Sequence, residues 1–560
     1  MRWTSLCWWS LILLSISSVR AQSSWQMGLD YQQQGDPLPP IWAYFGYDEP
    51  NYTYQPDGKK LLSELAALSP VPVYIRCHNL LTSGDGAPAL KWGSTNAYTE
   101  DAQGRPLYHW HIVDSIFDVY VQRGMRPLVE IGFTPEALSI HPQPYRHHWK
   151  PGTPYDSVYT GWAYPPNDYG KWGELVYQWV LHCVQRYGKK EVNTWLWEVW
   201  NEPNIGYWKG SRDEYFRLYD VAADAVKRAL PSARVGGPAT TGPGWDKAAG
   251  WLKDFLEHCA GGGNYVTAKK GAPLDFISFH AKGSPRLVEG HVRMNMAPQL
   301  RDIARGFGIV AASAFKDLPI YITECDPEGC AACGMTTNPE NAYRNGTMYS
   351  SYTAASFARI YDLAARWHVN LQGAMSWSFE FEGQKWFDGF RDLATNGIDK
   401  PVLNVFRMYG MMQGRRVPVE NPAGLPLDSL LSNSLYGGRT DVHALAVAGV
   451  RQLTVMVWNY MDDDLPGEAV NMTILVRHLP AGQPRFRHFR IDEAHSNAYE
   501  AWKKMGAPSS VSETAYRDLE KMGGLSELAV PERVKTPGTG ETSVSFVLPP
   551  HAVSLLKWNW

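Results

Sequence analysis

The chain has 560 residues and a formal net charge of −3, with 44% apolar and 19% charged residues. This is the composition of a globular protein that is long enough for more than one structural unit. The near-neutral charge gives no reason to expect nucleic acid or an anionic membrane as a partner. The 24 Trp and 30 Tyr residues are less ordinary. Aromatic faces suit the C–H patches of sugars, although large aromatic side chains also fill protein cores.

The first residues are typical of a secretory signal. Met1-Arg2 is a short basic start, residues 6–16 are mostly apolar, and Val19-Arg20-Ala21 resembles a small-residue cleavage site. We therefore expect residues 1–21 to be a signal peptide and the protein to be secreted, into either the periplasm or the medium. An uncleaved anchor is the alternative. No later segment has the apolar length of a membrane span.

Residues 41–414 alternate short apolar runs with longer helical patterns. The apolar runs predict eight strands, at Trp42–Tyr47, Pro72–Arg76, Pro127–Gly132, Thr194–Asn201, Ala233–Gly237, Leu274–His280, Leu318–Glu324 and Gln372–Phe379. The helical patterns lie at Lys59–Ala67, Ile112–Arg123, Lys171–Tyr187, Asp213–Ala229, Lys247–Cys259, Met296–Arg305, Tyr349–Arg366 and Pro401–Gln413. Eight such units predict an α/β fold, a (β/α)8 TIM barrel, rather than an open doubly wound sheet. No GxGxxG or GxxxxGK[ST] motif opens a helix, so the usual mark of a nucleotide fold is missing.

The pattern changes in residues 415–560. Short strands separated by turn residues are predicted at Val442–Val450, Gln452–Tyr460, Ala469–Arg477, Ser543–Leu548 and Ala552–Trp558. They favour a C-terminal antiparallel β-sandwich domain. Residues 22–40 are polar and flanked by proline, and we expect them to form an N-terminal arm packed on this sandwich.

Six cysteines follow the predicted signal: Cys77, Cys183, Cys259, Cys325, Cys330 and Cys333. In a secreted chain they permit up to three disulfides, with a connectivity that the sequence does not give. Cys330 and Cys333 have the spacing of metal ligands, but no second pair of ligands accompanies them. A disulfide or buried thiols are therefore favoured over a zinc site.

Two glutamates stand where apolar strands end. Glu202 closes the run Thr194–Glu202 and Glu324 closes the run Leu318–Glu324, each with a proline shortly after it. The carboxyl ends of barrel strands form the catalytic face, so both side chains are expected at the same mouth. Glycoside hydrolysis needs such a pair, roughly 5–5.5 Å apart in a retaining enzyme. The alternative for either glutamate alone is a helix cap or an arginine partner.

Three tryptophans precede the first of these glutamates. We expect Trp195, Trp197 and Trp200 to give Glu202 surroundings of low dielectric. Such surroundings disfavour an ionised carboxyl group, which is what a proton donor needs.

Short motifs around both glutamates resemble those of glycoside hydrolase family 39. Trp200-Asn201-Glu202-Pro203 and Ile322-Thr323-Glu324 are similar to the acid/base and nucleophile motifs of its clan. The family itself is indicated by Arg76-Cys77-His78-Asn79, by the run Gly132–Leu138 and by the run Arg490–Tyr499, which is similar to bacterial β-xylosidases. The resemblance covers most of the chain after the predicted signal. It implies a retaining double displacement on an oligosaccharide or polysaccharide, with no metal or organic cofactor.

The resemblance also implies a role for each matched residue. Glu202 would be the acid/base, Glu324 the nucleophile, and Asn201 a ligand of the sugar 2-hydroxyl. Further substrate-binding candidates are His78, His280, Lys282, Trp377 and Glu382, with Trp377 as the floor of the first sugar subsite and Glu380 competing for the role of Glu382. The alternatives are a scaffold role for either histidine and a core position for Trp377.

Two segments depart from the β-xylosidase pattern. Phe279-His280-Ala281-Lys282-Gly283 and Glu324-Cys325-Asp326-Pro327 are more similar to the α-L-iduronidases of the family, whose lysine meets the carboxylate on C5. Lys282 would then recognise a uronic acid, or else bond a neutral hydroxyl, or pair with Asp326. From the C-terminal resemblance we expect an exo-acting β-xylosidase. An α-L-iduronidase-like enzyme, or another uronide or pentoside hydrolase, is the alternative.

Two other classes of protein remain to be weighed. A non-catalytic carbohydrate-binding protein would normally have lost one of the two glutamates. A metallohydrolase would need a metal motif, and no HxH or HExxH sequence stands on a predicted strand or helix. The loop 139–165 is rich in Pro, His, Trp and Tyr, and we expect it to narrow the site. The sequence does not determine the oligomeric state.

Overall fold

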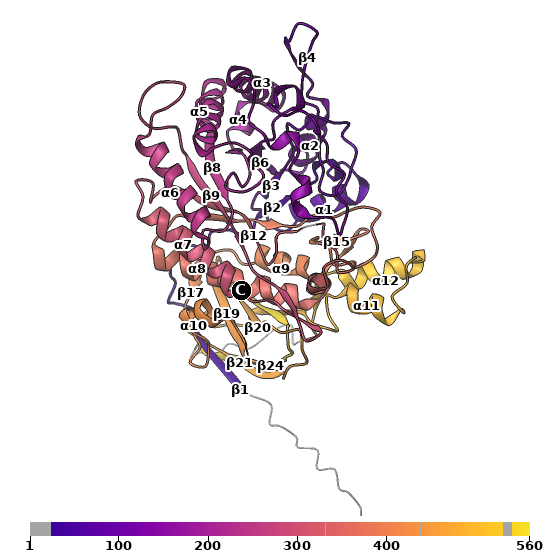
Figure 1. Cartoon of the computed structure of the whole chain (residues 1–560). Coiled ribbons are helices and arrows are strands. Elements are labelled where there is room, and N and C mark those ends of the chain that lie inside the picture. Colours follow the sequence, from indigo (N-terminus) through magenta and orange to yellow (C-terminus); the bar gives the residue numbers. More distant parts are fainter. Residues whose placement is uncertain (1–23, 331, 437, 530–539) are drawn as a thin grey trace, which may run out of the picture.

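The computed structural model describes residues 24–330, 332–436, 438–529 and 540–560. Its larger part is a barrel of parallel strands surrounded by helices (Figure 1). The strands are β2 (Tyr44–Tyr47), β3 (Tyr74–Cys77), β6 (Arg126–Ile131), β7 (Leu196–Val199), β8 (Arg234–Thr240), β9 (Phe276–Lys282), β12 (Ile320–Asp326) and an eighth strand in two pieces, β13 (Leu371–Ala374) and β14 (Ser376–Trp377). Because β13 pairs with β12 and β14 pairs with β2, the sheet closes on itself. The predicted (β/α)8 barrel is confirmed.

Each predicted helix has a counterpart around the barrel. The helices are α1 (Pro56–Ala66), α2 (His111–Val121), α3 (Tyr169–Tyr187), α5 (Arg212–Ala229), α6 (Asp246–Gly261), α7 (Ala297–Ala311), α8 (Thr347–Trp367) and α9 (Pro401–Gly410), with the short α4 (Lys189–Val192) after α3. Their first turns are specified locally. In α5, for example, Ser211 accepts a hydrogen bond from the backbone of Glu214, whose side chain accepts one in return from Ser211. Three hairpins lie outside the barrel sheet, formed by β4 (Tyr98–Glu100) with β5 (Pro106–Tyr108), β10 (Arg286–Val288) with β11 (His291–Arg293), and β15 (Ala394–Thr395) with β16 (Ile398–Asp399).

The C-terminal part is a sandwich of two sheets, which Figure 1 shows below the barrel. One sheet has the order β18 (Val419–Glu420), β1 (Ser24–Asp30), β21 (Val470–Arg477), β24 (Thr542–Leu548). The other has the order β17 (Arg415–Val417), β19 (Thr440–Gly449), β20 (Gln452–Met461), β25 (Val553–Asn559), β22 (Arg485–Ile491), β23 (Ser526–Glu527). All neighbours are antiparallel except β1, which runs parallel to β21. The N-terminal segment is therefore a strand of this sheet, and Met27 and Leu29 lie in the core of the sandwich.

Helix α8 connects the barrel with the sandwich. Arg359 donates to Asp441 of β19 over 2.7 Å, and the ring of Tyr352 packs edge-on against Tyr460 of β20. The barrel therefore rests on the second sheet of the sandwich through buried side chains. A short helix, α10 (Leu427–Asn433), lies beside α7, where Arg301 donates to the Leu431 carbonyl over 2.9 Å.

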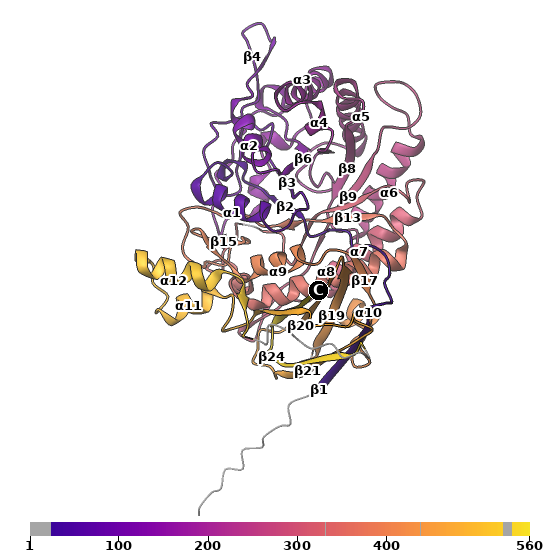
Figure 2. The same cartoon turned by 180° about the vertical axis from the view of Figure 1, so that it is seen from behind.

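Two helices after β22 extend to the side of the barrel. They are α11 (Ala498–Lys504) and α12 (Glu513–Gly523), drawn in yellow in Figure 2. Ala498 and Leu519 share a small core with Phe387 and Ile398, which lie in the segment after β14. These helices were not predicted from the sequence. They brace the barrel segment that follows the eighth strand.

The predicted signal at residues 1–21 lies outside the described residues. Within the part of the chain that the structure describes, no helix has both the length and the apolarity to cross a bilayer.

Of the cysteines, Cys330 and Cys333 form a disulfide, while Cys77, Cys183, Cys259 and Cys325 are buried free thiols. The sequence allowed up to three bridges, and these six cysteines form one. Since the sulfurs of Cys330 and Cys333 are bonded to each other, they are not thiolate ligands of a metal.

Candidate active site

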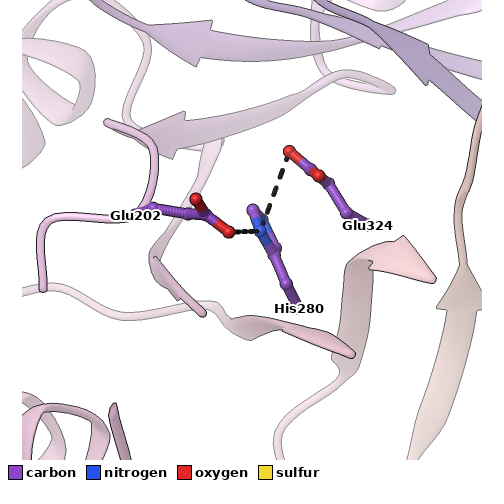
Figure 3. Close-up of side chains that lie close together, drawn as sticks. All are labelled: Glu202, His280 and Glu324. Atoms are coloured by element: carbon purple, nitrogen blue, oxygen red, sulfur yellow. Dashed lines mark hydrogen bonds and ion pairs between the residues drawn. The ribbon is translucent and has the colours of Figure 1, made fainter. Parts of the chain in front are cut away.

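The two glutamates at the ends of β7 and β12 line one cavity of about 940 Å³. A carboxyl oxygen of Glu202, a carboxyl oxygen of Glu324 and a ring nitrogen of His280 all lie within 4.8 Å of one another (Figure 3). His280 Nδ1 is 2.8 Å from Glu202 Oε1 and 3.7 Å from Glu324 Oε1. The structure therefore brings together three of the residues predicted from the sequence, with the histidine of β9 between the two carboxylates.

The turn that carries Glu202 has an unusual backbone. Trp200 has φ 73° and Glu202 has φ 42°, in the left-handed region that side-chain-bearing residues rarely adopt. The Glu202 amide donates to the Ala239 carbonyl over 2.9 Å, and the Trp200 indole donates to the Tyr207 carbonyl over 3.0 Å. Such conformations persist only where the surroundings hold them. These bonds fix the direction in which Glu202 leaves β7.

The prediction that three tryptophans give Glu202 surroundings of low dielectric is wrong for Trp195 and Trp197. Trp195 and Trp197 point away from the cavity and pack against the outer helices, Trp197 with its ring 5.7 Å from that of Trp179 in α3. Side chains alternate along a strand, so these residues and those that face the barrel interior lie on opposite sides of β7. The aromatic residues that share the cavity with Glu202 are instead Trp149, Tyr155, Tyr207 and Trp245.

The loop 139–165 lines the cavity with Trp149, Gly152, Thr153, Pro154 and Tyr155. The loop therefore forms part of the wall of the site, as the prediction that it narrows the site requires. The hydroxyl of Tyr155 lies 2.9 Å from that of Tyr207, which ties the loop to the segment after β7. The disulfide of Cys330 and Cys333 forms another part of the wall, which the sequence analysis did not foresee.

A fully buried arginine, Arg76 of β3, holds the carboxylates of the barrel interior together. Its guanidinium nitrogens lie 2.5 Å from Glu198, 2.9 Å from Glu130 and 3.5 Å from Glu324. It also donates to Asn201 Oδ1 over 3.0 Å. The Arg76 motif was used to recognise the family, but its contact with both Asn201 and the carboxylates emerges only from the fold.

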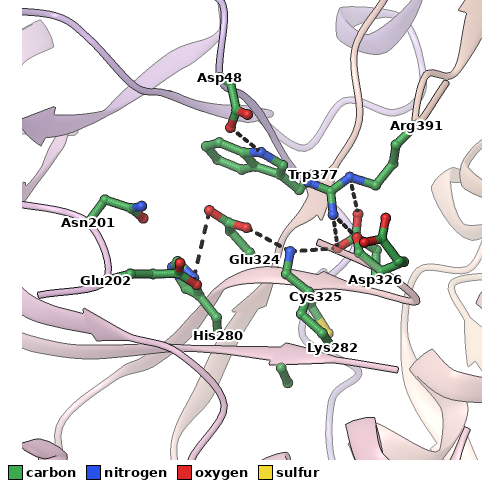
Figure 4. A network of polar contacts seen from close by, with 12 residues as sticks. Asp48, Asn201, Glu202, His280, Lys282, Glu324, Cys325, Asp326, Trp377 and Arg391 are labelled. Atoms are coloured by element: carbon green, nitrogen blue, oxygen red, sulfur yellow. Dashed lines mark hydrogen bonds and ion pairs between the residues drawn. The ribbon is translucent and has the colours of Figure 1, made fainter. Parts of the chain in front are cut away.

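Besides Arg76, three nitrogen-bearing side chains lie close to Glu324: His78, His280 and Lys282, of which Figure 4 labels the last two. Lys282 Nζ lies 2.7 Å from Glu324 Oε2 and 2.9 Å from Asp326 Oδ1, and His78 Nε2 lies 3.5 Å from Glu324 Oε1. Burial alone would raise the pKa of Glu324. The charges of Lys282 and His280 and the contact with His78 outweigh burial and hold the pKa of Glu324 well below its usual value. Glu324 is therefore an ionised carboxylate, available as a nucleophile.

Trp377 of β14 is held in place by Asp48. The indole donates to Asp48 Oδ1 over 2.8 Å, and the Arg76 guanidinium lies 5.0 Å from the centre of the ring. Gly46 of β2 makes this position possible, since a Cβ there would overlap the ring. Asp48 itself lines the cavity and forms an ion pair with the buried Lys91. Asp48 was not predicted as a site residue from the sequence. It follows the first barrel strand, just as Glu202 follows the fourth.

Asp326 lies between two cations. Besides Lys282, it contacts the buried Arg391, whose Nε is 3.1 Å from Asp326 Oδ2. Of the three roles considered for Lys282, pairing with Asp326 is the one that the structure displays. Arg391 gave no signal in the sequence, because it lies in an irregular segment after the eighth strand.

The structure does not bring Glu382 into this group. Its carboxyl accepts a hydrogen bond from the backbone of Asp57 at the start of α1, and burial together with the charge of Asp57 raises the pKa of Glu382. Glu380 accepts a hydrogen bond from the Gly397 amide over 2.6 Å. Among the contacts of the described residues, none joins either side chain to Glu202 or Glu324.

Among the described residues, one group is spaced closely enough to hold a metal ion: Glu202, His280 and Glu324. The charges around them argue against it. Lys282 and Arg76 both lie within 3.5 Å of Glu324 and would repel a further cation. This arrangement suits a reaction in which the two carboxyl groups act directly on an uncharged substrate.

Residues 25–536 match the sequence model of Glycosyl hydrolases family 39. The chain is 29% identical over 503 residues to a β-xylosidase of Geobacillus stearothermophilus, and the aligned region covers 86% of each chain. It is also 29% identical over 457 residues to a β-xylosidase of Caldicellulosiruptor saccharolyticus, covering 79% of this chain and 81% of that one. A crystal structure of the GH39 enzyme from Xanthomonas axonopodis pv. citri superimposes with a TM-score of 0.74 at 23% identity, over 98% and 99% of the two chains.

A parallel barrel with two carboxyl groups at the carboxyl ends of its strands is an architecture of glycoside hydrolases. The family match over most of its length shows that this chain belongs to glycoside hydrolase family 39. It is a glycosidase, as the sequence motifs indicated.

Proposed function

We propose that this glycosidase is a retaining, exo-acting β-xylosidase that releases xylose from the non-reducing ends of xylo-oligosaccharides. The observation that carries the retaining mechanism is the proximity of Glu202 and Glu324, whose nearest oxygens lie within 4.8 Å. Retaining enzymes hold their carboxyl groups roughly 5–5.5 Å apart, and inverting enzymes roughly 6.5–9.5 Å apart, to admit a water. The short gap supports direct attack by a carboxylate on the sugar.

The two glutamates would divide the work between them. Glu324, kept ionised by its neighbours, attacks the anomeric carbon, while Glu202 gives its proton to the departing oxygen. The glycosyl group is then bound covalently to Glu324. In the second step Glu202 takes a proton from water, which displaces Glu324 and restores the anomeric configuration.

Buried polar atoms without a partner would meet the sugar. Asn201 Nδ2 and His280 Nε2 are buried and have no hydrogen-bond partner among the described residues. Buried donors are rarely left unpaired, so both atoms are suited to substrate hydroxyls. Asn201 would donate to the 2-hydroxyl, a contact that strengthens in the transition state. Its other amide atom is fixed by Arg76, which sets the direction of the free N–H group.

Three considerations support a neutral pentose over a uronic acid. The ammonium group of Lys282 is already matched by Glu324 and Asp326, at 2.7 and 2.9 Å. A sugar carboxylate would add negative charge beside Glu324, Asp326 and the cavity-lining Glu328. The relatives at 29% identity are both β-xylosidases.

The exo preference and the secreted location belong to the same proposal. The wall formed by the loop 139–165 supports binding of a chain end rather than the middle of a chain. The disulfide of Cys330 and Cys333 supports an oxidising compartment, because disulfides persist outside the cytosol. The leader-like residues 1–21 agree with such a destination.

The proposal is tested by assaying the purified protein on an aryl β-D-xyloside and an aryl α-L-iduronide side by side. We expect turnover of the xyloside, and none in the Glu324→Ala variant, which serves as the blank. Turnover of the iduronide alone would reject the pentoside and assign Lys282 to the carboxylate of the sugar. Activity on neither substrate would reject β-xylosidase as the function.

Replacing Lys282 with Met should shift the pH dependence of the reaction. The ionised form of Glu324 is the reactive one, so activity is lost as the pH falls through its pKa. Lys282 holds that pKa down, and its removal raises the pKa. The acid limb of kcat/KM for the aryl xyloside is therefore expected at higher pH in Lys282→Met. Lys282→Arg keeps the charge and should leave the limb close to its original position. An unmoved limb in Lys282→Met would contradict this account of Glu324.

A further inference from the structure

A half-exposed tryptophan faces the cavity from the segment between β8 and α6. Trp245 is 50% exposed and lines the cavity together with Glu202. Trp149 and Tyr207, which also line it, are almost fully buried. An indole in this position offers a flat apolar surface to whatever the cavity admits.

The segment that carries Trp245 is fixed in place. The Gly244 amide donates to Asp302 Oδ1 of α7 over 2.8 Å, and Arg305 donates to the Gly244 carbonyl over 3.0 Å. Gly242 and Gly244 pass so close to Asp302 that a Cβ at either position would overlap its carboxyl group. Trp245 is therefore presented by a braced turn rather than by a loose loop.

The same segment is joined to the turn of the acid/base residue. The Glu202 amide donates to the Ala239 carbonyl over 2.9 Å. Asn204 accepts a hydrogen bond from the Thr241 amide over 3.0 Å and donates to the Thr241 hydroxyl over 2.6 Å. Glu202 and Trp245 therefore belong to two turns that are linked side by side at the mouth of the barrel.

The chemistry of Glu202 identifies what lies beside it. A general acid protonates the oxygen that leaves, so the leaving group occupies the side of the cavity that Glu202 faces. Thr241, Gly242 and Trp245 line the same cavity of about 940 Å³ as Glu202, and their turn is joined to the turn of Glu202. The indole therefore lies on the side of the leaving group.

We propose that Trp245 is the stacking platform of a leaving-group subsite, which binds the first sugar on the reducing-end side of the cleaved bond. The C–H face of a pyranose ring would lie on the indole, while Glu202 reaches the linking oxygen. This inference rests on the proposed function, and it adds which residue binds the sugar that leaves. Trp245 would raise the affinity for the leaving sugar without contacting the sugar that becomes bound to Glu324.

Comparing two substrates tests the subsite. The wild-type protein and Trp245→Ala are assayed on xylobiose and on β-D-xylosyl fluoride, whose fluoride leaving group is too small to contact the indole. Truncation of a stacking aromatic should lower kcat/KM for xylobiose about tenfold. Fluoride leaves without acid assistance and occupies no sugar subsite, so kcat/KM for xylosyl fluoride should change by less than about twofold. Trp245→Phe, which keeps an aromatic face, should recover most of the xylobiose activity.

Tyr265→Ala provides the matched control, because Tyr265 is 52% exposed and does not line the cavity. It should leave both substrates unaffected. Equal losses on both substrates in Trp245→Ala, or none on xylobiose, would overturn the subsite. A wild-type protein without activity on the aryl xyloside would instead refute the proposed β-xylosidase function, so the two failures are distinguishable.

Discussion

Replacing Glu324 with Ala is expected to lower kcat on aryl β-D-xyloside by about 10,000-fold or more, the effect of removing a nucleophile. The pKa of Glu324 is held well below its usual value, so the wild-type group is ionised and ready to attack. The methyl group that replaces the carboxylate in the Ala variant cannot attack the anomeric carbon. Azide should restore turnover, because a small anion can occupy the space of the carboxylate. The product should be the α-glycosyl azide, which NMR distinguishes from the β-anomer.

For the Glu202→Ala variant we expect the opposite anomer of the azide product. With a good aryl leaving group, the attack by Glu324 proceeds without acid assistance, and the covalent intermediate accumulates because water is not activated. Azide should then intercept the intermediate and yield the β-glycosyl azide. Glu324→Gln keeps the volume of the side chain, and azide should not rescue it. If both Ala variants gave the same azide anomer, the division of roles between Glu202 and Glu324 would be wrong.

The second large effect is expected from Arg76. Arg76→Met removes the only guanidinium within 4 Å of the buried Glu130, Glu198 and Glu324 among the described residues. Unpaired buried carboxylates are costly, and breaking such a pair typically reduces stability by about 3–5 kcal/mol. Urea unfolding followed by tryptophan fluorescence should report this loss at neutral pH.

A surface arginine supplies the comparison for this experiment. Arg105 pairs with Asp101 over 2.7 Å, but its side chain is 75% exposed, and Arg105→Met should change stability by less than about 0.5 kcal/mol. Arg76→Lys keeps the charge with fewer donors and should fall between the two. A loss in Arg76→Met no larger than in Arg105→Met would show that the buried carboxylates do not depend on Arg76.

Much of the barrel was predictable, because each strand is a short apolar run bounded by turn residues. The sandwich was harder to predict. Strand β22 has the sequence Arg485-Phe-Arg-His-Phe-Arg-Ile491, in which buried arginine and histidine interrupt the apolar alternation. Arg490 is accommodated by Asp492, by Ser554 of β25 and by the Val547 carbonyl of β24. Two of these partners come from other strands, so a local pattern does not reveal them.

The candidate site, like the fold, was only partly predictable from the sequence. Glu202 and Glu324 were predicted because each closes a predicted apolar strand, and parallel strands bring their carboxyl ends together. His280 was predicted from the family resemblance. Asp48 had the same signal but no neighbouring motif to draw attention to it. Arg391 reaches Asp326 from an irregular segment, and the contact of Glu382 with Asp57 depends on how that segment folds. Long-range placement of loops is the information that a linear pattern lacks.

Strand β1 can join its sheet only after later parts of the chain have been synthesised. It precedes the barrel in the chain, yet its partners β18 and β21 follow the barrel. During synthesis, the strand made first must wait until nearly the whole polypeptide has emerged before it can join its sheet. Long-range closure of this kind is slow, and an unpaired apolar strand is a target for misassembly. We therefore expect β1 to pair only after β21 has been made, and a fragment that ends with the barrel would leave β1 without these partners.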